Sequence, residues 1–218
     1  MSYLNRESSV FALQKMKSFH DECRQLYTKH GFDLMDNPGR RNIILSQAQE
    51  KFFADALSKL YKGVVSDGAT GQPDIIVGEI DKELECKLTS RHKGGSISFQ
   101  SDYQTLLKKG KLDYLYVVAS KDFEKFAVLH FQNLTADDFR PLSNGSRGKV
   151  AMYKHKGMKK CNVLVGSAIN KNEIYLREIE DQLERDDLTP SKRNTLISRK
   201  KYWDNAPAKY TYELEEIN

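Results

Sequence analysis

Apolar side chains recur every three or four residues near the start of the chain, a spacing that predicts an amphipathic helix. The helix is expected from Ser8 or Ser9 to His30, with a serine as its N-cap and Gly31 just after its end. Its apolar positions are Val10, Leu13, Met16, Phe19, Cys23 and Leu26.

A second helix is predicted after a turn at residues 36–39, and it ends near Gly63. Arg40 and Arg41 lead into this helix. They are candidates for phosphate contact, with loop solubility as the alternative interpretation.

Apolar β-branched residues lie on both sides of a Gly/Asp-rich centre between positions 71 and 89, which predicts a β-hairpin with its turn near residues 81 and 82. In its second strand, a period of two sends Leu84, Cys86 and Leu88 to one face of the sheet. The opposite face receives Glu83, Glu85, Lys87 and Thr89. Further strands are predicted at 112–119, 125–131, 150–153 and 161–165, the last two as a hairpin around a lysine-rich segment.

The C-terminal part of the chain predicts two more helices. Residues 172–185 alternate charged residues with apolar ones, and Thr189 followed by Pro190 begins a basic helix. We expect residues 170–218 to form a helical appendage for dimerisation or DNA contact. The alternative is a terminal helical hairpin packed on the core through Leu196, Ile197 and Trp203.

Length and composition predict one folded domain over residues 1–218. The net charge of +5 comes from 35 basic and 30 acidic residues, so clusters of basic residues matter more than the total. Three cysteines without metal-ligand spacing favour free thiols in a reducing compartment. No signal peptide or membrane-spanning run is recognised, and the expected location is the cytoplasm.

The candidate chemistry lies in the predicted hairpin. Asp74, directly after Pro73, and Glu85 place one carboxylate on each of two neighbouring strands. Mg²⁺ is usually held by one or two carboxylates together with water and substrate phosphate oxygens. Lys87 lies two residues beyond Glu85 on the same face, where its amine can orient or deprotonate water and offset charge on phosphorus. A solvated strand surface with cross-strand ion pairs is the alternative.

Pro73-Asp74, a short spacer and Glu85-Cys86-Lys87 resemble the signature of the PD-(D/E)xK nucleases. The resemblance implies a mixed β-sheet flanked by helices, which here means about five strands with a C-terminal helical extension. It also implies Mg²⁺-dependent hydrolysis of phosphodiester bonds to 5′-phosphate and 3′-hydroxyl ends. Asp74, Glu85 and the carbonyl of Cys86 would be metal ligands, and Lys87 the catalytic amine.

Many members of this family carry a glutamate on the helix before the motif strand. Glu50 has the corresponding position in the second predicted helix and is a further catalytic candidate. The alternative for Glu50 is an exposed helical glutamate paired with a neighbouring lysine.

Three stretches are candidates for DNA contact. A basic loop beyond the proposed catalytic lysine contributes Arg91, His92 and Lys93. A later polar loop is the candidate for reading base edges and contributes Ser146, Arg147 and Lys149. Gln100 is the third candidate; the spacing from Gln100 to Tyr103 departs from the Gln and Tyr pair of exonuclease branches of the superfamily, so that role is not transferred.

These features together predict a Mg²⁺-dependent, sequence-specific endodeoxyribonuclease that resembles type II restriction enzymes and acts on double-stranded DNA as a homodimer. The first alternative is a structure-selective nuclease, such as a junction resolvase or a repair endonuclease. The second is a DNA-binding protein that keeps the nuclease fold without catalysis.

Overall fold

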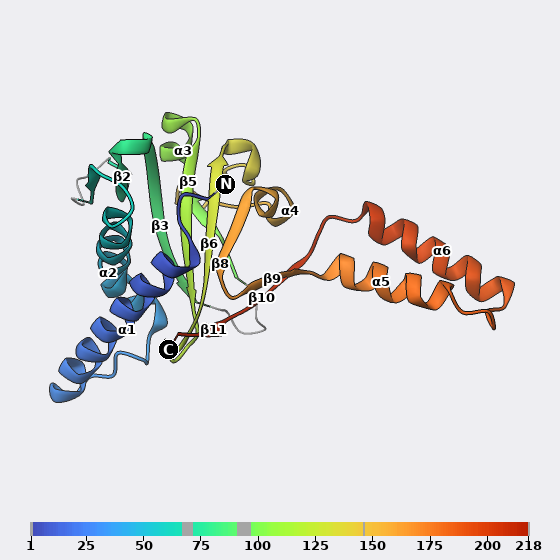
Figure 1. The fold of residues 1–218 in the computed structure, drawn as a ribbon, viewed down its shortest axis with the longest axis horizontal. Helices are drawn as coiled ribbons and strands as arrows, with labels where there is room; N and C mark the ends of the chain where they lie inside the picture. The colour runs from blue at the N-terminus through green and yellow to red at the C-terminus, as the bar shows by residue number, and fades with distance from the viewer. Residues whose placement is uncertain (1, 67–71, 91–96, 146, 218) are drawn as a thin grey trace. The chain divides into compact units, whose positions relative to one another are not determined.

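The computed structural model describes residues 2–66, 72–90, 97–145 and 147–217 of the chain. Two compact units are present, Met1–Ser167 with Glu213–Asn218, and Ala168–Tyr212. The first unit is an α/β fold in which helices flank a mixed sheet, which confirms the predicted class at this level (Figure 1).

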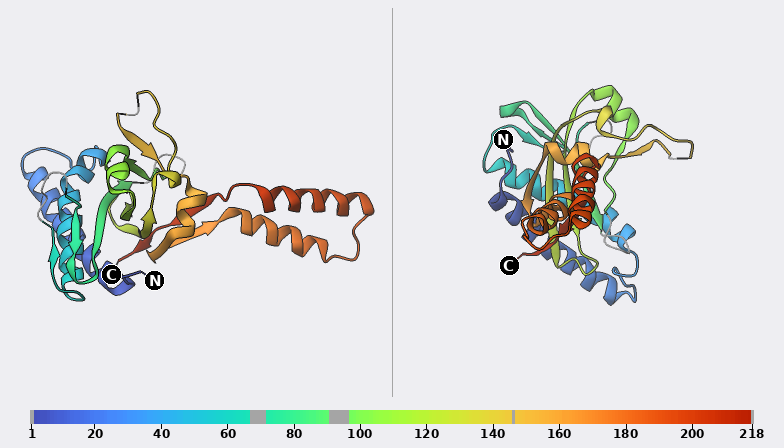
Figure 2. Two further views of the ribbon diagram at one scale, coloured as in Figure 1. Left: turned by 90° about the horizontal axis from the view of Figure 1, so that it is seen from above. Right: turned by 90° about the vertical axis from the view of Figure 1, so that its right-hand side faces the viewer.

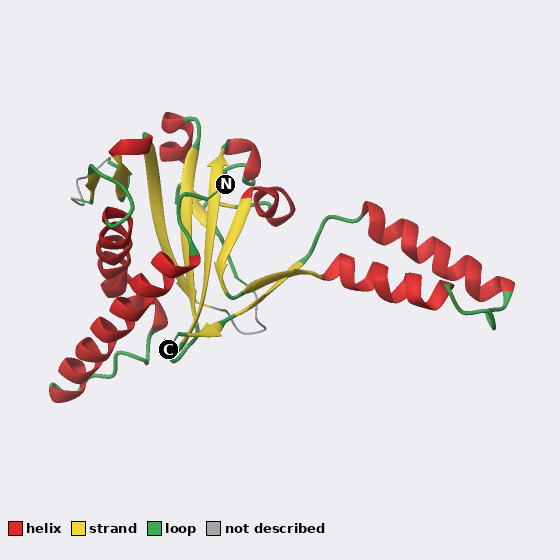
Figure 3. Cartoon of the chain, viewed as in Figure 1, coloured by secondary structure: helices red, strands yellow, loops and turns green. Residues whose placement is uncertain are grey.

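The central sheet, yellow in Figure 3, has seven strands over the described residues, in the order β1-β2-β3-β5-β6-β11 with β8 also paired to β6. They are β1 (Val64–Val65), β2 (Ile75–Val77), β3 (Lys82–Ser90), β5 (Leu112–Ala119), β6 (Lys125–Leu134), β8 (Cys161–Val165) and β11 (Glu215–Glu216). Strands β3 and β5 are parallel, and the other pairs are antiparallel. A parallel pair needs a crossover connection, and helix α3 (Tyr103–Lys109) lies in it.

Helices α1 (Arg6–Lys29) and α2 (Pro38–Ser58) cover one face of this sheet (Figure 2). Leu13 of α1 and Phe53 of α2 are fully buried, in one cluster with Leu115 of β5. The predicted serine cap of the first helix is wrong, because Asn5 is the N-cap and Ser8 stands three residues further in, as its partner in a capping box. The second helix ends at Ser58, earlier than predicted.

Aromatic side chains fill the opposite face of the sheet. The two residues flanking Leu115 in β5 are Tyr114 and Tyr116, and the period of two turns them away from the helices. Phe99 packs on Tyr116 and Phe131 with ring centroids 4.9 Å and 5.4 Å away. These rings are buried, and they support the segment that leads into α3.

A small two-stranded sheet joins β4 (Gln100–Asp102) to β7 (Lys149–Ala151) in antiparallel register. The predicted lysine-rich hairpin between 150–153 and 161–165 is therefore wrong: β7 pairs with β4, and β8 with β6. Helix α4 (Lys154–Gly157) and the 3₁₀ turn η3 (Met158–Lys160) occupy the lysine-rich segment.

The second unit contains strands β9 (Ser167–Asn170) and β10 (Tyr210–Glu213) and helices α5 (Lys171–Leu183) and α6 (Pro190–Asn205). The two helices lie where the sequence predicted them and pack together, with Tyr175 and Trp203 rings 4.7 Å apart. Residues after Asn205 form short strands instead of more helix. Among the helices that the structure describes, none is long and apolar enough to cross a membrane.

Candidate active site

Strands β2 and β3 form the predicted hairpin, in which Ile75 lies opposite Leu84. The connection is the 3₁₀ turn η1 (Gly78–Ile80), followed by Asp81 with a φ of 50°. Aspartate tolerates this left-handed conformation better than most residues. Asp74 stands directly before β2, and its Oδ2 accepts a hydrogen bond of 2.6 Å from the backbone N–H of Cys86.

The alternation of side chains along β3 separates residues that pack in the core from residues that face the candidate site. Leu84 and Cys86 are buried against the helices, whereas Glu85 and Lys87 lie on the other face. Burial raises the pKa of the Cys86 thiol well above its ordinary value, so this side chain is a protonated core residue. Only the backbone of Cys86 is available to the site.

Lys87 brings the two carboxylates together. Its Nζ lies 2.9 Å from Oε2 of Glu85 and 3.7 Å from Oδ2 of Asp74. The side chains of Lys87, Asp74 and Glu85 are 32%, 25% and 14% exposed, so the group is shielded but open to a ligand. Burial alone lowers the pKa of Lys87, but the charges of Glu85 and Asp74 outweigh it and the net pKa is raised. Lys87 is therefore an ammonium at neutral pH in this arrangement.

Glu50, on α2, belongs to the same group of charges. Partial burial raises its pKa, and the negative charge of Asp74 raises it further, while Lys87 acts in the opposite direction. The neighbouring Lys51 pairs with Asp55, one helical turn along. Glu50 therefore lies within electrostatic range of Asp74, Glu85 and Lys87.

The donor set of this cluster suits a hard cation. Carboxylate oxygens of Asp74 and Glu85 both lie near the ammonium group of Lys87, which occupies the position between them. Among the described residues no three side chains of His, Cys, Asp or Glu lie close enough to enclose a metal ion by themselves. Two carboxylates completed by water and substrate oxygens are the usual environment of Mg²⁺, so these residues fit that ion.

A cleft of about 400 Å³ opens beside the cluster, and we call it the carboxylate cleft. Its lining residues are Gln72, Pro73, Asp74, Glu85, Gln104, Thr105, Lys108 and Lys109. Gln104 and Lys108 are exposed, and their i, i+4 spacing puts them on one face of α3. The sequence contains that spacing, but it does not indicate that this face of α3 meets the hairpin.

The predicted DNA-contacting residues are placed as follows. Gln100, Arg147 and Lys149 line a second pocket in the first unit, separate in its lining from the carboxylate cleft. Arg91, His92, Lys93 and Ser146 lie outside the described residues.

Arg41 is neither a loop residue nor a phosphate ligand. It lies inside α2 and is 0% exposed. Its guanidinium donates hydrogen bonds to the carbonyl of Lys121 and to Oγ of Ser90, and it stacks on the ring of Phe123. Arg41 therefore ties α2 to the ends of β3 and β5.

Replacing Arg41 with methionine is expected to destabilise the fold by about 1–3 kcal/mol, because buried hydrogen-bond acceptors lose their donor. Urea unfolding followed by circular dichroism measures this change. The matched control is Arg40→Met, since Arg40 is exposed in the same helical turn and its loss should cost less than about 0.5 kcal/mol. Equal unfolding midpoints for the two variants would contradict the structural role of Arg41.

Comparisons with known proteins add no assignment. Neither a scan against protein-family models nor a search of curated proteins finds a match to this chain. What the protein does must therefore be inferred from the residues of the cleft.

Proposed function

We propose that the chain is a Mg²⁺-dependent endodeoxyribonuclease of the PD-(D/E)xK type, which cuts double-stranded DNA at specific sites as type II restriction enzymes do. The observation that carries the proposal is the convergence of Asp74, Glu85 and Lys87 at the edge of a cleft. Two carboxylates and an ammonium at such distances match the needs of phosphodiester hydrolysis.

The order of the elements supports the same proposal. A helix carrying Glu50 precedes a hairpin carrying Asp74 and Glu85, and a helical crossover then leads to a parallel strand. This is the arrangement of a mixed sheet flanked by helices that the sequence resemblance implied.

In the proposed reaction, Asp74, Glu85 and the carbonyl of Cys86 would hold Mg²⁺. When bound, the ion would supply positive charge next to the scissile phosphate and would favour loss of a proton from the attacking water. Lys87 donates hydrogen bonds from its ammonium to the attacking water or to a phosphate oxygen, and so offsets the charge that builds on phosphorus.

The proposed reaction is a single displacement at phosphorus. The water oxygen bonds to phosphorus while the bond from phosphorus to the 3′ oxygen breaks. Glu50 is a carboxylate able to accept the proton that the water loses, and the 3′ oxygen takes up a proton from solvent. The products are a 5′-phosphate and a 3′-hydroxyl.

The substrate also needs contacts beside the reacting atoms. Lys108 is exposed on the wall of the carboxylate cleft, where it can neutralise a neighbouring phosphate. Lys109 pairs instead with Glu83 at 2.7 Å and holds α3 against β3. A homodimer supplies one such site for each strand of the duplex.

Incubating the protein with phage DNA and Mg²⁺ is expected to give fragments of discrete lengths, and EDTA should abolish them. Gel electrophoresis measures the fragment lengths. In a second assay with a circular plasmid as substrate, a linear product without a nicked one indicates that both strands are cut together. Cleavage of branched DNA alone would favour a resolvase, and binding without cleavage in Mg²⁺ or Mn²⁺ would contradict the nuclease proposal.

A further inference from the structure

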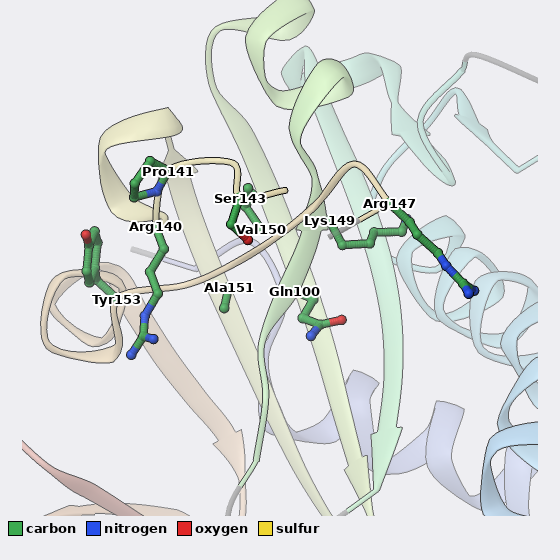
Figure 4. A pocket seen from close by; sticks show the side chains of 9 residues that line it. All are labelled: Gln100, Arg140, Pro141, Ser143, Arg147, Lys149, Val150, Ala151 and Tyr153. Atoms are coloured by element: carbon green, nitrogen blue, oxygen red, sulfur yellow. The ribbon is translucent and has the colours of Figure 1, made fainter. Parts of the chain in front are cut away.

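A pocket of about 810 Å³ in the first unit lies outside the catalytic cluster, and we call it the basic pocket (Figure 4). The lining residues that matter here are Gln100, Arg140, Ser143, Arg147, Lys149 and Tyr153. Its volume falls within the range of ordinary ligand pockets.

Positive charge is concentrated in the basic pocket. Arg140, Arg147 and Lys149 have exposed side chains. Within the described part of the chain, no carboxylate pairs with either arginine, and Lys149 lies 3.9 Å from its partner Asp102. Burial lowers the pKa of Lys154, and the positive charge of Arg140 lowers it further. The Arg140 and Arg147 side chains project at opposite sides of the pocket (Figure 4), and cations without a carboxylate partner favour an anionic ligand.

The Gln100 side chain, which lines the pocket, projects from backbone that a buried hydrogen bond fixes. Gln100 begins β4, and its backbone carbonyl accepts a hydrogen bond of 2.7 Å from the buried hydroxyl of Tyr116. Tyr116 belongs to the aromatic layer under the sheet. The exposed amide of Gln100 therefore projects from fixed backbone, and a glutamine amide can bind the edge of adenine in the major groove.

Hydrogen bonds connect the basic pocket to the helix that lines the carboxylate cleft. The N–H of Tyr103 donates to the carbonyl of Gly148 at 2.9 Å, and β4 pairs with β7 so that Asp102 lies opposite Lys149. Asp102 is also the N-cap of α3, because its side chain accepts from the N–H of Thr105 at 3.0 Å. One short segment thus carries both the wall of the pocket and the wall of the cleft.

The length of that segment limits the distance between the two sites. Gln100 lines the basic pocket and Gln104 lines the carboxylate cleft. Four residues of extended chain reach at most about 14 Å. Because a DNA strand rises about 3.4 Å per base pair, the backbone positions of Gln100 and Gln104 are no further apart than roughly four base pairs. A duplex that follows this segment can therefore contact both residues.

We propose that the basic pocket binds the duplex within a few base pairs of the scissile phosphodiester, with Arg140 and Arg147 on backbone phosphates and Gln100 on a base edge. This inference rests on the proposed function. It assigns base reading to Gln100 and backbone contact to Arg140 and Arg147, and the segment from Gln100 into α3 links the site of reading to the site of cutting.

The charge contacts are tested by DNA binding without cleavage. Lys87→Met protein, in EDTA buffer, is mixed with a fluorescent pool of 30-base-pair duplexes of random sequence, and anisotropy gives the affinity at several salt concentrations. Adding Arg140→Gln and Arg147→Gln should weaken binding by about tenfold per arginine. The slope of log affinity against log salt should fall by about 2, since each lost phosphate contact contributes about 0.9.

The matched control removes two exposed positive charges from α1, through Lys15→Gln and Arg24→Gln. This control should keep the parental affinity and salt slope. All four residues are exposed, and unchanged urea unfolding shows that each protein is folded. If the protein with Arg140→Gln and Arg147→Gln, which we call the pocket variant, binds DNA as tightly as Lys87→Met alone, the inference is overturned.

Base reading by Gln100 has its own test. The Lys87→Met protein is used to select duplexes from the random pool, and Gln100→Ala is compared in the same background. The preference at one base pair of the selected sequence should fall by about tenfold or more. An identical selected sequence, or none from the parent, would overturn the reading role.

Failure of this inference is distinguishable from failure of the proposed function. If the unmodified protein cuts phage DNA while the pocket variant binds normally, only the pocket assignment falls. If it never cuts but the pocket variant loses affinity, the nuclease proposal falls and DNA binding by the pocket stands.

Discussion

Replacing Lys87 with methionine is expected to lower the rate of DNA cleavage on the order of 10²–10³-fold, because the site loses the ammonium that offsets charge in the transition state. Methionine keeps most of the apolar stem of this half-buried side chain, so the fold should survive. Single-turnover cleavage of phage DNA with excess enzyme measures the chemical step, and anisotropy measures binding. Affinity should stay within about threefold, because one phosphate contact at most is lost.

Lys51→Met is the control for this variant. Lys51 follows Glu50 on α2, but it is exposed and pairs with Asp55 outside the cluster. It should cut DNA at the rate of the unmodified protein. Cleavage by Lys87→Met at that same rate would remove the amine from the reaction.

The hairpin that carries this lysine was predictable because its determinants are local. Alternation alone puts Leu84 and Cys86 inside and Glu85 and Lys87 outside, and the turn falls at Asp81 as expected. Helix α1 was predictable for the same reason, from apolar spacing. Its cap was misassigned because the capping box uses two polar residues, and the sequence pattern does not say which of them is the N-cap.

Strand partners were not predictable, because pairing is decided by contacts far along the chain. A strand at 150–153 was expected to belong to a local hairpin, yet the observed strand β7 (Lys149–Ala151) pairs with Gln100–Asp102. Both strands are three residues long, too short for their own pattern to specify a partner. The basic pocket depends on this pairing, which puts Gln100 opposite Ala151 and Asp102 opposite Lys149.

The cleft was only half predictable. Asp74 and Glu85 stood out because their spacing on two strands has a chemical meaning. Lys108 did not, because nothing local says which face of α3 meets the hairpin. Helix α3 lies in the crossover between the parallel strands β3 and β5, and only this long-range pairing brings it to the cleft.

Replacing Asp74 with asparagine is expected to lower cleavage by about a thousandfold, because one of the two carboxylates proposed to hold Mg²⁺ loses its charge while its shape is kept. The amide oxygen of asparagine can still accept the hydrogen bond from the N–H of Cys86, which the Asp74 carboxylate accepts at 2.6 Å. Structural damage should therefore be small. Isothermal titration with Mn²⁺ should show affinity reduced by more than about tenfold, the loss that even indirect partners of a metal can cause.

The matched control is Asp81→Asn, at the turn of the same hairpin. Asp81 has a positive φ that asparagine also tolerates, and it is exposed outside the carboxylate cleft. Both variants lose one negative charge, so a change confined to Asp74→Asn assigns the effect to the position of the carboxylate. If the two variants bind Mn²⁺ and cut DNA equally well, Asp74 is not a metal ligand, and the hairpin carries only a surface ion pair.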